Sequence, residues 1–403
     1  MIPSNMDVLD TFLQSFYPAL DDRLPLPRWY HPATFALAVT CSFFGYNKIS
    51  TIVCCSLLFY LFLQRPYYTS GLPLGDFCFG AAPLVILLKL ATFHASPPRY
   101  LGPKPGGRGV SIEDLPSLKQ KLLWAVALQS TVRGIGWDWQ VKGVPAHPEA
   151  TSLPRWKWLE MQALRVVRHL ILRAIALYTL GFCRVLQASS TSAQVIKLYD
   201  VAIAWSGAMW LYQSILILGS AGGFMTVSRG VDEPWQWPSM LGPLTEAWSV
   251  RQMWGVSYHQ MFRRAFQEPS IKLTRFLGLK KGSLGSRYFQ LYFVFALSAF
   301  YHFWGQFIVS RRDQGEWAFF MTQPLLITLE DFVQWNWAKV VGPVSCRSAH
   351  LRRFERVVGY VWTFACFSWT LTPHVRNRAG LGAAGKPAPL ELGSRHATSF
   401  LRA

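Results

Sequence analysis

The stretch YFQLYFVFALSAFYHFWGQFIVS, residues 288–310, runs for 23 positions without an Asp, Glu, Lys or Arg. A helix rises 1.5 Å per residue, so about 20 apolar residues cross the hydrocarbon core of a bilayer. The stretch therefore predicts a transmembrane helix. Its one readily ionisable side chain, His302, lies inside the apolar run. A titratable group is costly there and is a candidate functional residue.

Similar runs elsewhere predict an all-α, polytopic integral membrane protein with about seven or eight transmembrane helices and some re-entrant or interfacial segments. Residues 1–28 are expected to be an extramembrane segment, residues 29–373 one membrane-embedded domain, and residues 374–403 a flexible tail rich in Gly, Ala and Pro. The candidate spans are residues 29–64 (one span or a hairpin of two), 77–93, 170–187, 201–228, 288–310, 317–337 and 357–373.

The chain is basic, with 40 Lys and Arg against 21 Asp and Glu, yet only 15% of its residues are charged. Soluble proteins average about 25% charged residues. A basic balance can indicate nucleic-acid binding, but these cations cluster in loops between apolar runs, which is typical of cytosolic loops. We therefore expect the bilayer, and no nucleic acid, as a partner. Residues 94–168 and 251–287 are expected on the cytosolic side. The N-terminus lies opposite if 29–64 is a hairpin, and is cytosolic if it is one span.

A second informative stretch is LTEAWSVRQMWGVSYHQMFRR, residues 244–264. If it is helical, Arg251, Gly255, His259 and Arg263 share one face at steps of four. Glycine allows close approach of a ligand or another backbone. Arginines on both sides of a histidine suit a phosphate-bearing ligand. The alternative is an interfacial amphipathic helix whose basic face meets lipid phosphates.

The third stretch, RGIGWDW at residues 133–139, combines two glycines, two tryptophans and a charge pair. Its glycines permit a tight turn or close approach of a ligand. Its tryptophans suit the depth of lipid headgroups. Arg133 is expected to pair with an anion, either a ligand phosphate or Asp138. A re-entrant interfacial turn without a ligand is the alternative.

A few other polar side chains interrupt the predicted spans. Ser298 and Gln306 lie four residues before and after His302, on the same helix face, where either one can orient the imidazole. Glu330 and Asp331 lie inside an apolar run and are costly unless paired or wetted. We expect them to line a cavity or to pair with an arginine from another helix.

Together these stretches resemble the wax-synthase-like members of the membrane-bound O-acyltransferases. SVRQMWGVSYHQ is similar to their Ser-x-Arg-x-Phe-Trp-Gly-x-x-Trp-His-Gln signature, and FALSAFYH is similar to their Ser-Gly-x-x-His element. RGIGWDW is similar to an upstream Arg-Gly-x-Gly-Trp element of fungal members. The three occur in family order, and the resemblance spans roughly residues 30–370. It is nearest to fungal O-acetyltransferases of meroterpenoid and trichothecene type. Met253, Tyr258 and Ala299 depart from the pattern and affect pocket shape more than chemistry.

The resemblance implies that His302 is the catalytic histidine and His259 the second active-site residue. A neutral imidazole can take the proton of an alcohol as its oxygen attacks a thioester. His259, Gln260 or a backbone N–H can then stabilise the oxyanion. The residues expected to contact the acceptor or coenzyme A are Arg251, Trp254, Gly255, Gln260, Arg263, Arg264, Ser298, Arg133 and Trp137.

The predicted activity is transfer of an acetyl group from acetyl-CoA to a hydroxyl of a lipophilic, terpenoid-like metabolite. The expected location is the endoplasmic reticulum membrane. Acyl-CoA is then a co-substrate, and the sequence marks no metal, no tightly bound cofactor and no particular oligomeric state. Three alternatives stay open: a long-chain alcohol or sterol O-fatty-acyltransferase, a transporter with a proton relay, and a terpene cyclase using Glu330 or Asp331. No GxSxG or HxxxD motif occurs, which argues against lipase-type and soluble plant-type acyltransferases.

Overall fold

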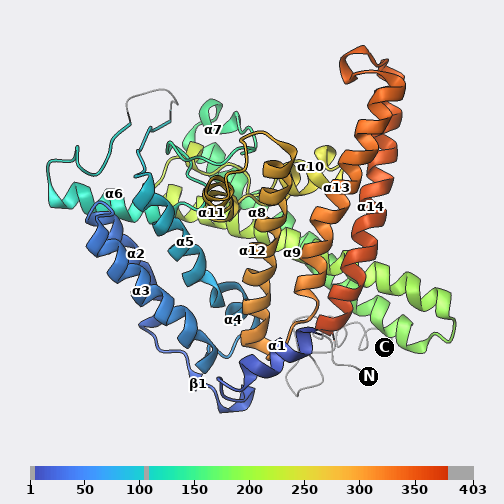
Figure 1. Ribbon diagram of the computed structural model, residues 1–403, viewed down its shortest axis with the longest axis horizontal. Helices are drawn as coiled ribbons and strands as arrows, with labels where there is room; N and C mark the ends of the chain where they lie inside the picture. The colour runs from blue at the N-terminus through green and yellow to red at the C-terminus, as the bar shows by residue number, and fades with distance from the viewer. Residues whose placement is uncertain (1–4, 104–108, 380–403) are drawn as a thin grey trace. The chain divides into compact units, whose positions relative to one another are not determined.

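The computed structural model describes residues 5–103 and 109–379, and almost all of its regular structure is helical (Figure 1). The chain divides into two compact units. The first holds residues 1–141 and 261–321, and the second holds residues 142–260 and 322–403. Helix α13, Glu316–Val341, begins in the first unit and continues in the second.

The first unit contains most of the N-terminal half of the chain and the helix that carries His302. Two short strands, β1 (Leu24–Pro25) and β2 (Tyr68–Thr69), pair in parallel within it. Its helices are α1 (Asn5–Gln14), α2 (Tyr30–Phe43), α3 (Lys48–Gln64), α4 (Pro73–Gly80), α5 (Ala82–Ala95), α6 (Leu118–Ser130), α11 (Arg263–Phe276) and α12 (Leu284–Ser310).

The second unit is built around two long helices, α8 and α9, which form an antiparallel hairpin (Figure 1). It also contains the turn that carries His259. Its helices are α7 (Glu149–Ser152), α8 (Arg155–Ser189), α9 (Ala193–Ser228), α10 (Val250–Gln252), a π-helix (Met253–Ser257) and α14 (Ala349–Ala379).

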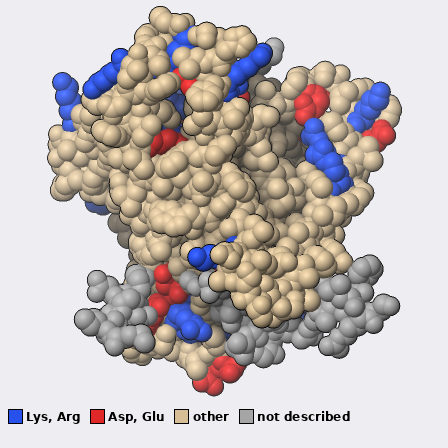
Figure 2. All heavy atoms as spheres, turned by 90° about the vertical axis from the view of Figure 1, so that its right-hand side faces the viewer, with Lys and Arg blue, Asp and Glu red and all other residues tan. Residues whose placement is uncertain are grey.

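Five helical segments are long and apolar enough to cross a membrane: residues 48–67, 73–95, 155–189, 193–228 and 284–310. This confirms the prediction of a largely helical, polytopic membrane protein. Large apolar side chains on these segments face outward, as Ile49 and Phe59 do on α3. On the face drawn in Figure 2 most of the surface is likewise uncharged. Such a surface suits a hydrocarbon solvent.

Residues 29–64 form a hairpin of two helices rather than one span. The turn between α2 and α3 contains Gly45 and Tyr46, both with positive φ, and Asn47 caps α3 by accepting from the N–H of Ser50. At the other end of the chain, α14 continues to Ala379, so the first residues of the predicted tail are helical. Residues 380–403 lie outside the described part, as do residues 1–4 of the predicted N-terminal segment.

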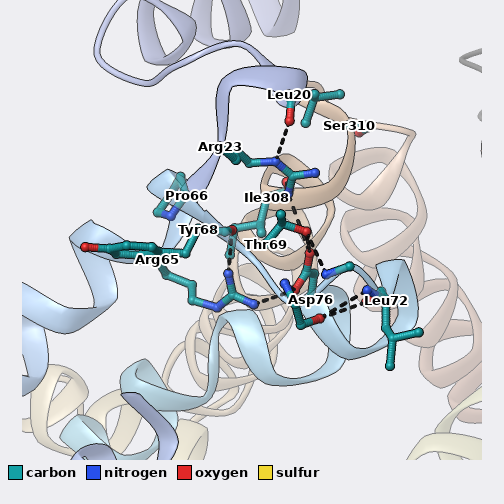
Figure 3. A network of polar contacts seen from close by, with 12 residues as sticks. Leu20, Arg23, Arg65, Pro66, Tyr68, Thr69, Leu72, Asp76, Ile308 and Ser310 are labelled. Carbon is teal, nitrogen blue, oxygen red and sulfur yellow. Dashed lines mark hydrogen bonds and ion pairs between the residues drawn. The ribbon is translucent and has the colours of Figure 1, made fainter. Parts of the chain in front are cut away.

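A buried ionic network ties the N-terminal segment to the end of α12 (Figure 3). Asp76, near the start of α4, accepts hydrogen bonds from Arg65 (2.7 Å) and from the hydroxyl of Thr69 (2.7 Å). Arg23 lies 3.6 Å from the same carboxylate and donates to the carbonyl of Ile308 (2.9 Å). The last carbonyls of a helix have no partner within it, so Arg23 satisfies one of them.

Arg311 completes this end of α12. Its backbone is left-handed (φ 60°), as is common where a helix stops. Its guanidinium donates to the carbonyls of Pro18 (3.1 Å) and Pro66 (2.6 Å), and Gln14 donates to the Arg311 carbonyl (2.6 Å). The end of the His302 helix is thus fixed from several sides within the first unit.

Candidate active site

His302 lies half-buried in α12, in the first unit. Its imidazole stacks on the ring of Phe320, with ring centroids 4.4 Å apart and planes 16° from parallel. Phe77 of α4 lies at 5.9 Å with a tilt of 37°. Ser298 is half-buried one turn earlier. Gln306 donates its side-chain amide to Ser310 (3.1 Å), so it serves the end of the helix rather than the imidazole.

The approach of α4 to α12 is close at two glycines. A Cβ on Gly305 would lie 2.7 Å from the carbonyl oxygen of Phe77, and a Cβ on Gly80 would lie 2.5 Å from Ile308. The Phe77 oxygen belongs to the backbone, so position 305 requires glycine for this crossing, whereas at position 80 the end of the Ile308 side chain can shift to make room. The crossing places Phe77 beside His302.

The signature stretch is not one helix. It consists of α10, the π-helix Met253–Ser257, a break, and then α11 from Arg263. The chain leaves the helical conformation at Tyr258 (φ −86°, ψ 168°). Arg251, Gly255, His259 and Arg263 therefore do not share a face at helical spacing. The prediction assumed regular α-helix, whereas π-helical turns are rare and occur frequently at functional sites.

The start of α10 is held by the two acids of α13. Glu330 accepts the backbone N–H groups of Val250 (2.8 Å) and Arg251 (3.0 Å) and the indole N–H of Trp362 (3.0 Å). Asp331 forms a two-point ion pair with the guanidinium of Arg251. The prediction of pairing with an arginine is confirmed for Asp331, whereas Glu330 accepts backbone and indole N–H groups instead. A carboxylate at a helix N-terminus is also favoured by the helix dipole.

The middle of the signature stretch combines fixed side chains with one open position. The indole N–H of Trp254 donates to Gln323 of α13 (3.1 Å). The buried Gln260 donates to the carbonyls of Trp254 and Tyr258 (both 2.9 Å) and so holds the break after the π-helix. Gly255 differs, since a Cβ built on it would meet nothing within 4 Å.

His259 lies in that break, half-buried, with its ring 4.5 Å from the ring of Tyr258. Burial lowers the pKa of the imidazole from 6.5 to about 4. Desolvation disfavours the charged form of a histidine, so His259 is neutral near pH 7. A neutral imidazole has one N–H donor and one acceptor nitrogen, which is what stabilising an oxyanion or relaying a proton requires.

Arg263 and Arg264 begin α11 in the first unit. Arg264 pairs with Glu268 one turn later (2.6 Å). Burial lowers the pKa of the half-buried Arg263. Arg264 also lines a cavity of about 90 Å³ between α2, α5 and α11, together with Lys89, Gln129, Trp139 and Phe262. In this cavity two cations and an amide stand among apolar side chains.

Lys89 was not predicted as part of a site, although it is the one charge in the apolar run 77–93. Its ammonium donates to the carbonyls of Leu128 (2.8 Å) and Thr131 (3.1 Å), at the end of α6. It also lies over the ring of Trp139 (5.2 Å). The sequence did contain a signal for Lys89, namely a single lysine in an apolar run, because a charged group in such a run needs polar partners inside the protein.

RGIGWDW forms a tight, buried turn in the first unit. Gly134 (φ 66°) and Gly136 (φ 79°) are left-handed, and the ring of Trp139 packs 2.7 Å from where a Cβ of Gly134 would lie. Trp137 is buried against Tyr100 and Trp124. The prediction of tryptophans at headgroup depth is therefore wrong, because these rings form part of the core.

Of the two charges of RGIGWDW, Arg133 is buried and Asp138 is exposed. The Asp138 carboxylate accepts from the backbone N–H of Arg99 (3.0 Å). Arg133 is 4% exposed, and burial lowers its pKa to about 10. No group of three or more His, Cys, Asp or Glu among residues 5–103 and 109–379 is arranged to hold a metal ion.

Comparison with known proteins agrees with the resemblance seen in the motifs. Residues 237–322, which include both candidate histidines, match the model of the membrane bound O-acyl transferase family. The chain is 31% identical over 258 residues to acetyltransferase ple2 of Rhodocybe pseudopiperita and 30% identical over 267 residues to acetyltransferase eriL of Hericium erinaceus. These alignments cover 63% and 64% of this chain, and 66% of each relative.

A further relative is named as a different kind of transferase. The chain is 29% identical over 276 residues to O-Mevalon transferase macI of Penicillium terrestre, covering 63% of this chain and 62% of the relative. No solved structure matches this chain.

Proposed function

We propose that this chain, a member of the membrane bound O-acyl transferase family through its residues 237–322, transfers an acetyl group from acetyl-CoA to a hydroxyl of a lipophilic, terpenoid-like metabolite. The observation that carries the proposal is His302, placed within an apolar helix of the matched segment. Two relatives named as fungal acetyltransferases support the acyl group.

In this reaction His302 acts as general base. Its imidazole takes the hydroxyl proton of the acceptor while the acceptor oxygen attacks the thioester carbonyl. The tetrahedral oxyanion collapses, the carbon–sulfur bond breaks, and the coenzyme A thiolate leaves with the proton from the imidazolium. No acyl-enzyme forms. His259 donates a hydrogen bond to the oxyanion, a role for which its neutral imidazole is suited.

The donor needs cations for its phosphates, and we assign this role to Arg263 and Arg264 at the start of α11. Arginine binds phosphate through several N–H groups in a fixed plane. Arg264 has a single-point ion pair with Glu268, whereas Arg251 is held at two points by Asp331, so we assign Arg251 the support of the π-helix instead. Trp254, Gly255 and Gln260 shape the pocket around the reacting groups. Arg133 and Trp137 act on it indirectly, because they are buried in their own turn.

We also propose seven or eight membrane crossings, adding α13, α14 and the shorter α2 to the five clearest spans. Exposed apolar side chains recur along α14 at helical spacing and make a stripe that suits lipid: Phe354, Val357, Val358, Val361 and Phe364. Residues 29–373 would then act as one catalytic domain in the endoplasmic reticulum membrane. The acceptor enters from the bilayer and acetyl-CoA from the cytosol.

The direct test uses membranes that contain the full chain, labelled acetyl-CoA and a panel of lipophilic alcohols. We expect transfer of label by the wild type and none by His302→Ala at the same folded amount. Label transfer that survives in His302→Ala would overturn the proposed base. A donor series from acetyl to palmitoyl distinguishes this activity from fatty-acyl transfer.

A second test concerns the two histidines, which the proposed mechanism brings into one chamber. In a background whose seven native cysteines are replaced by serine, the double variant His259→Cys with His302→Cys should cross-link in membranes with a short bifunctional maleimide, whereas either single change should not. Efficient cross-linking is expected only if the two positions face the same space. A double variant that resists cross-linking while both thiols react with a monofunctional maleimide would contradict the shared chamber.

The transporter and cyclase alternatives both need a free acid in the membrane. Both oxygens of Glu330 accept hydrogen bonds, and Asp331 is paired with Arg251. These contacts leave neither acid available for alkene protonation or a proton relay, which favours the transferase.

A further inference from the structure

The aromatic surroundings of His302 come from two helices of the first unit. Phe320, near the start of α13, is buried and stacks on the imidazole, with ring centroids 4.4 Å apart. Phe77 of α4 adds a second ring at 5.9 Å. Neither contact follows from the sequence, because Phe320 lies 18 positions after the histidine on another helix and Phe77 lies 225 positions before it.

A stacked ring fixes an imidazole in a particular way. Stacking occupies a face of the heterocycle, whereas both nitrogens lie in its plane at the edge. Phe320 therefore restricts rotation of the imidazole about its side-chain bonds and consumes no hydrogen-bonding capacity. A base that must meet a hydroxyl within about 3 Å benefits from such restriction, since misplacement by 1 Å can lower a rate about 100-fold.

The position of Phe77 is itself tightly determined. The glycine crossing brings its carbonyl oxygen against Gly305, one turn from His302. The hydroxyl of Tyr301 donates to the carbonyl of Cys78 (3.2 Å), one residue after Phe77. Directly before Phe77, Asp76 is held by Arg65 and Thr69 in the ionic network. Helix α4 is thus held on both sides of Phe77, by α12 at Cys78 and by the ionic network at Asp76.

We propose that Phe320 and Phe77 are positioning residues that set the plane of the catalytic imidazole, with Phe320 as the main contact. This inference rests on the proposed function, in which His302 is the base. It assigns a role to two residues outside all three motifs. It also explains why α12 carries glycine at position 305, where a larger residue would push α4 and Phe77 away.

The test compares Phe320→Leu with Phe320→Tyr in the full chain, in membranes, with acetyl-CoA and the most reactive alcohol of the panel. Leucine keeps the apolar volume and removes the flat ring, whereas tyrosine keeps the ring. For Phe320→Leu we expect kcat per folded protein to fall roughly ten- to a hundred-fold. The KM for acetyl-CoA should change less than two-fold. Phe320→Tyr should retain most of the wild-type kcat, and Phe77→Leu should show a smaller fall than Phe320→Leu.

The matched control is Phe303→Leu. Phe303 follows His302 directly and is 1% exposed, but its ring packs on Phe307 and Trp317. Its loss should lower the melting temperature and leave kcat per folded protein nearly unchanged. If Phe320→Leu is not recovered folded, Phe320→Met and Phe77→Leu are compared with the control in the same way.

Two outcomes separate this inference from the proposed function. If His302→Ala abolishes transfer while Phe320→Leu and Phe77→Leu keep wild-type kcat, the positioning role is wrong and the base stands. If His302→Ala remains active, the proposed function and this inference both fail. A fall in kcat for Phe303→Leu equal to that for Phe320→Leu would also overturn the positioning role, because general packing would explain both.

Discussion

Arg251 and Asp331 form an ion pair in which the guanidinium Nε lies 3.0 Å from one carboxylate oxygen and a second N–H reaches the other oxygen. The arginine of the signature motif is therefore held by its own chain. Together with Glu330, this pair fixes α10 and the π-helix that follows it. One of the arginines expected to meet a phosphate is thus part of the support for the histidine turn.

A double-variant comparison distinguishes the two roles of Arg251. If its task is to pair with Asp331, Arg251→Gln and Asp331→Asn should lower activity by similar amounts. The double variant should then lose no more than the larger single change, because contacting residues are not additive. Kinetics with acetyl-CoA measure this. A raised KM for acetyl-CoA in Arg251→Gln alone would instead show that the arginine binds the donor.

Gly255 and Gly242 should respond oppositely to a single added methyl group. A Cβ on Gly255 meets nothing within 4 Å, whereas one on Gly242 would lie 2.2 Å from the carbonyl oxygen of Val256. We expect Gly255→Ala to fold normally and to lose transfer activity about ten-fold, because a methyl group there would narrow the open space that we propose as part of the substrate pocket. Gly242→Ala should unfold at a lower temperature. Thermal melting and label transfer on the same samples check both, and an active Gly255→Ala would remove that residue from the pocket.

Acid should destabilise this protein partly through His259. Its pKa is about 4 in the folded chain against an ordinary 6.5. Between these values the unfolded chain binds a proton that the folded chain does not, so stability falls as pH drops from 6.5 to 4 and recovers as pH rises. His259→Asn removes this contribution, and its melting temperature should decline less over that range. Equal declines in the variant and the wild type would contradict the shift.

The ionic network at the end of α12 should be far more sensitive than an exposed pair. The side chains of Asp76 and Arg65 are 2% and 0% exposed, and Asp76→Asn leaves buried cations without their counter-charge. Breaking such a pair costs about 3–5 kcal/mol. The side chains of Arg155 and Glu233 are 43% and 59% exposed, so Glu233→Gln should cost at most about 1 kcal/mol. Melting curves of the purified full chain compare them, and similar losses would refute this ranking.

Much of the architecture follows from runs of uncharged residues. Residues 288–310 predicted α12 to within four residues at its start and matched its end, because lipid tolerates few charges along a span. The sequence left residues 29–64 open between one span and a hairpin, because the single lysine of this run fits either arrangement. The turn itself rests on positive φ angles at Gly45 and Tyr46, which the pattern of charges does not reveal. The uncharged runs are less informative for α13 and α14, which carry charges paired within the fold.

The candidate site was only partly predictable. His302 and His259 were selected as candidates from their residue type and their place in the sequence. The π-helix was not predicted, because it depends on hydrogen bonds of Trp254 and Gln260 that hydrophobic periodicity does not reveal. Phe320 and Lys89 were not predicted, because their contacts are made with other helices: Phe320 stacks on His302 of α12, and Lys89 donates to the end of α6. Trp137 looked interfacial for its residue type, although its neighbours Tyr100 and Trp124 bury it.

The Arg23 contact with Ile308 also constrains how the molecule is made. The two partners are 285 residues apart in the chain. A ribosome adds about 5–20 residues per second, so roughly 15 to 60 s separate their synthesis. During that interval Arg23 lacks the Ile308 carbonyl as a hydrogen-bond acceptor, while the intervening helices are inserted. Locking of the His302 helix is therefore a late step of biogenesis, and nascent chains arrested before residue 308 should lack it.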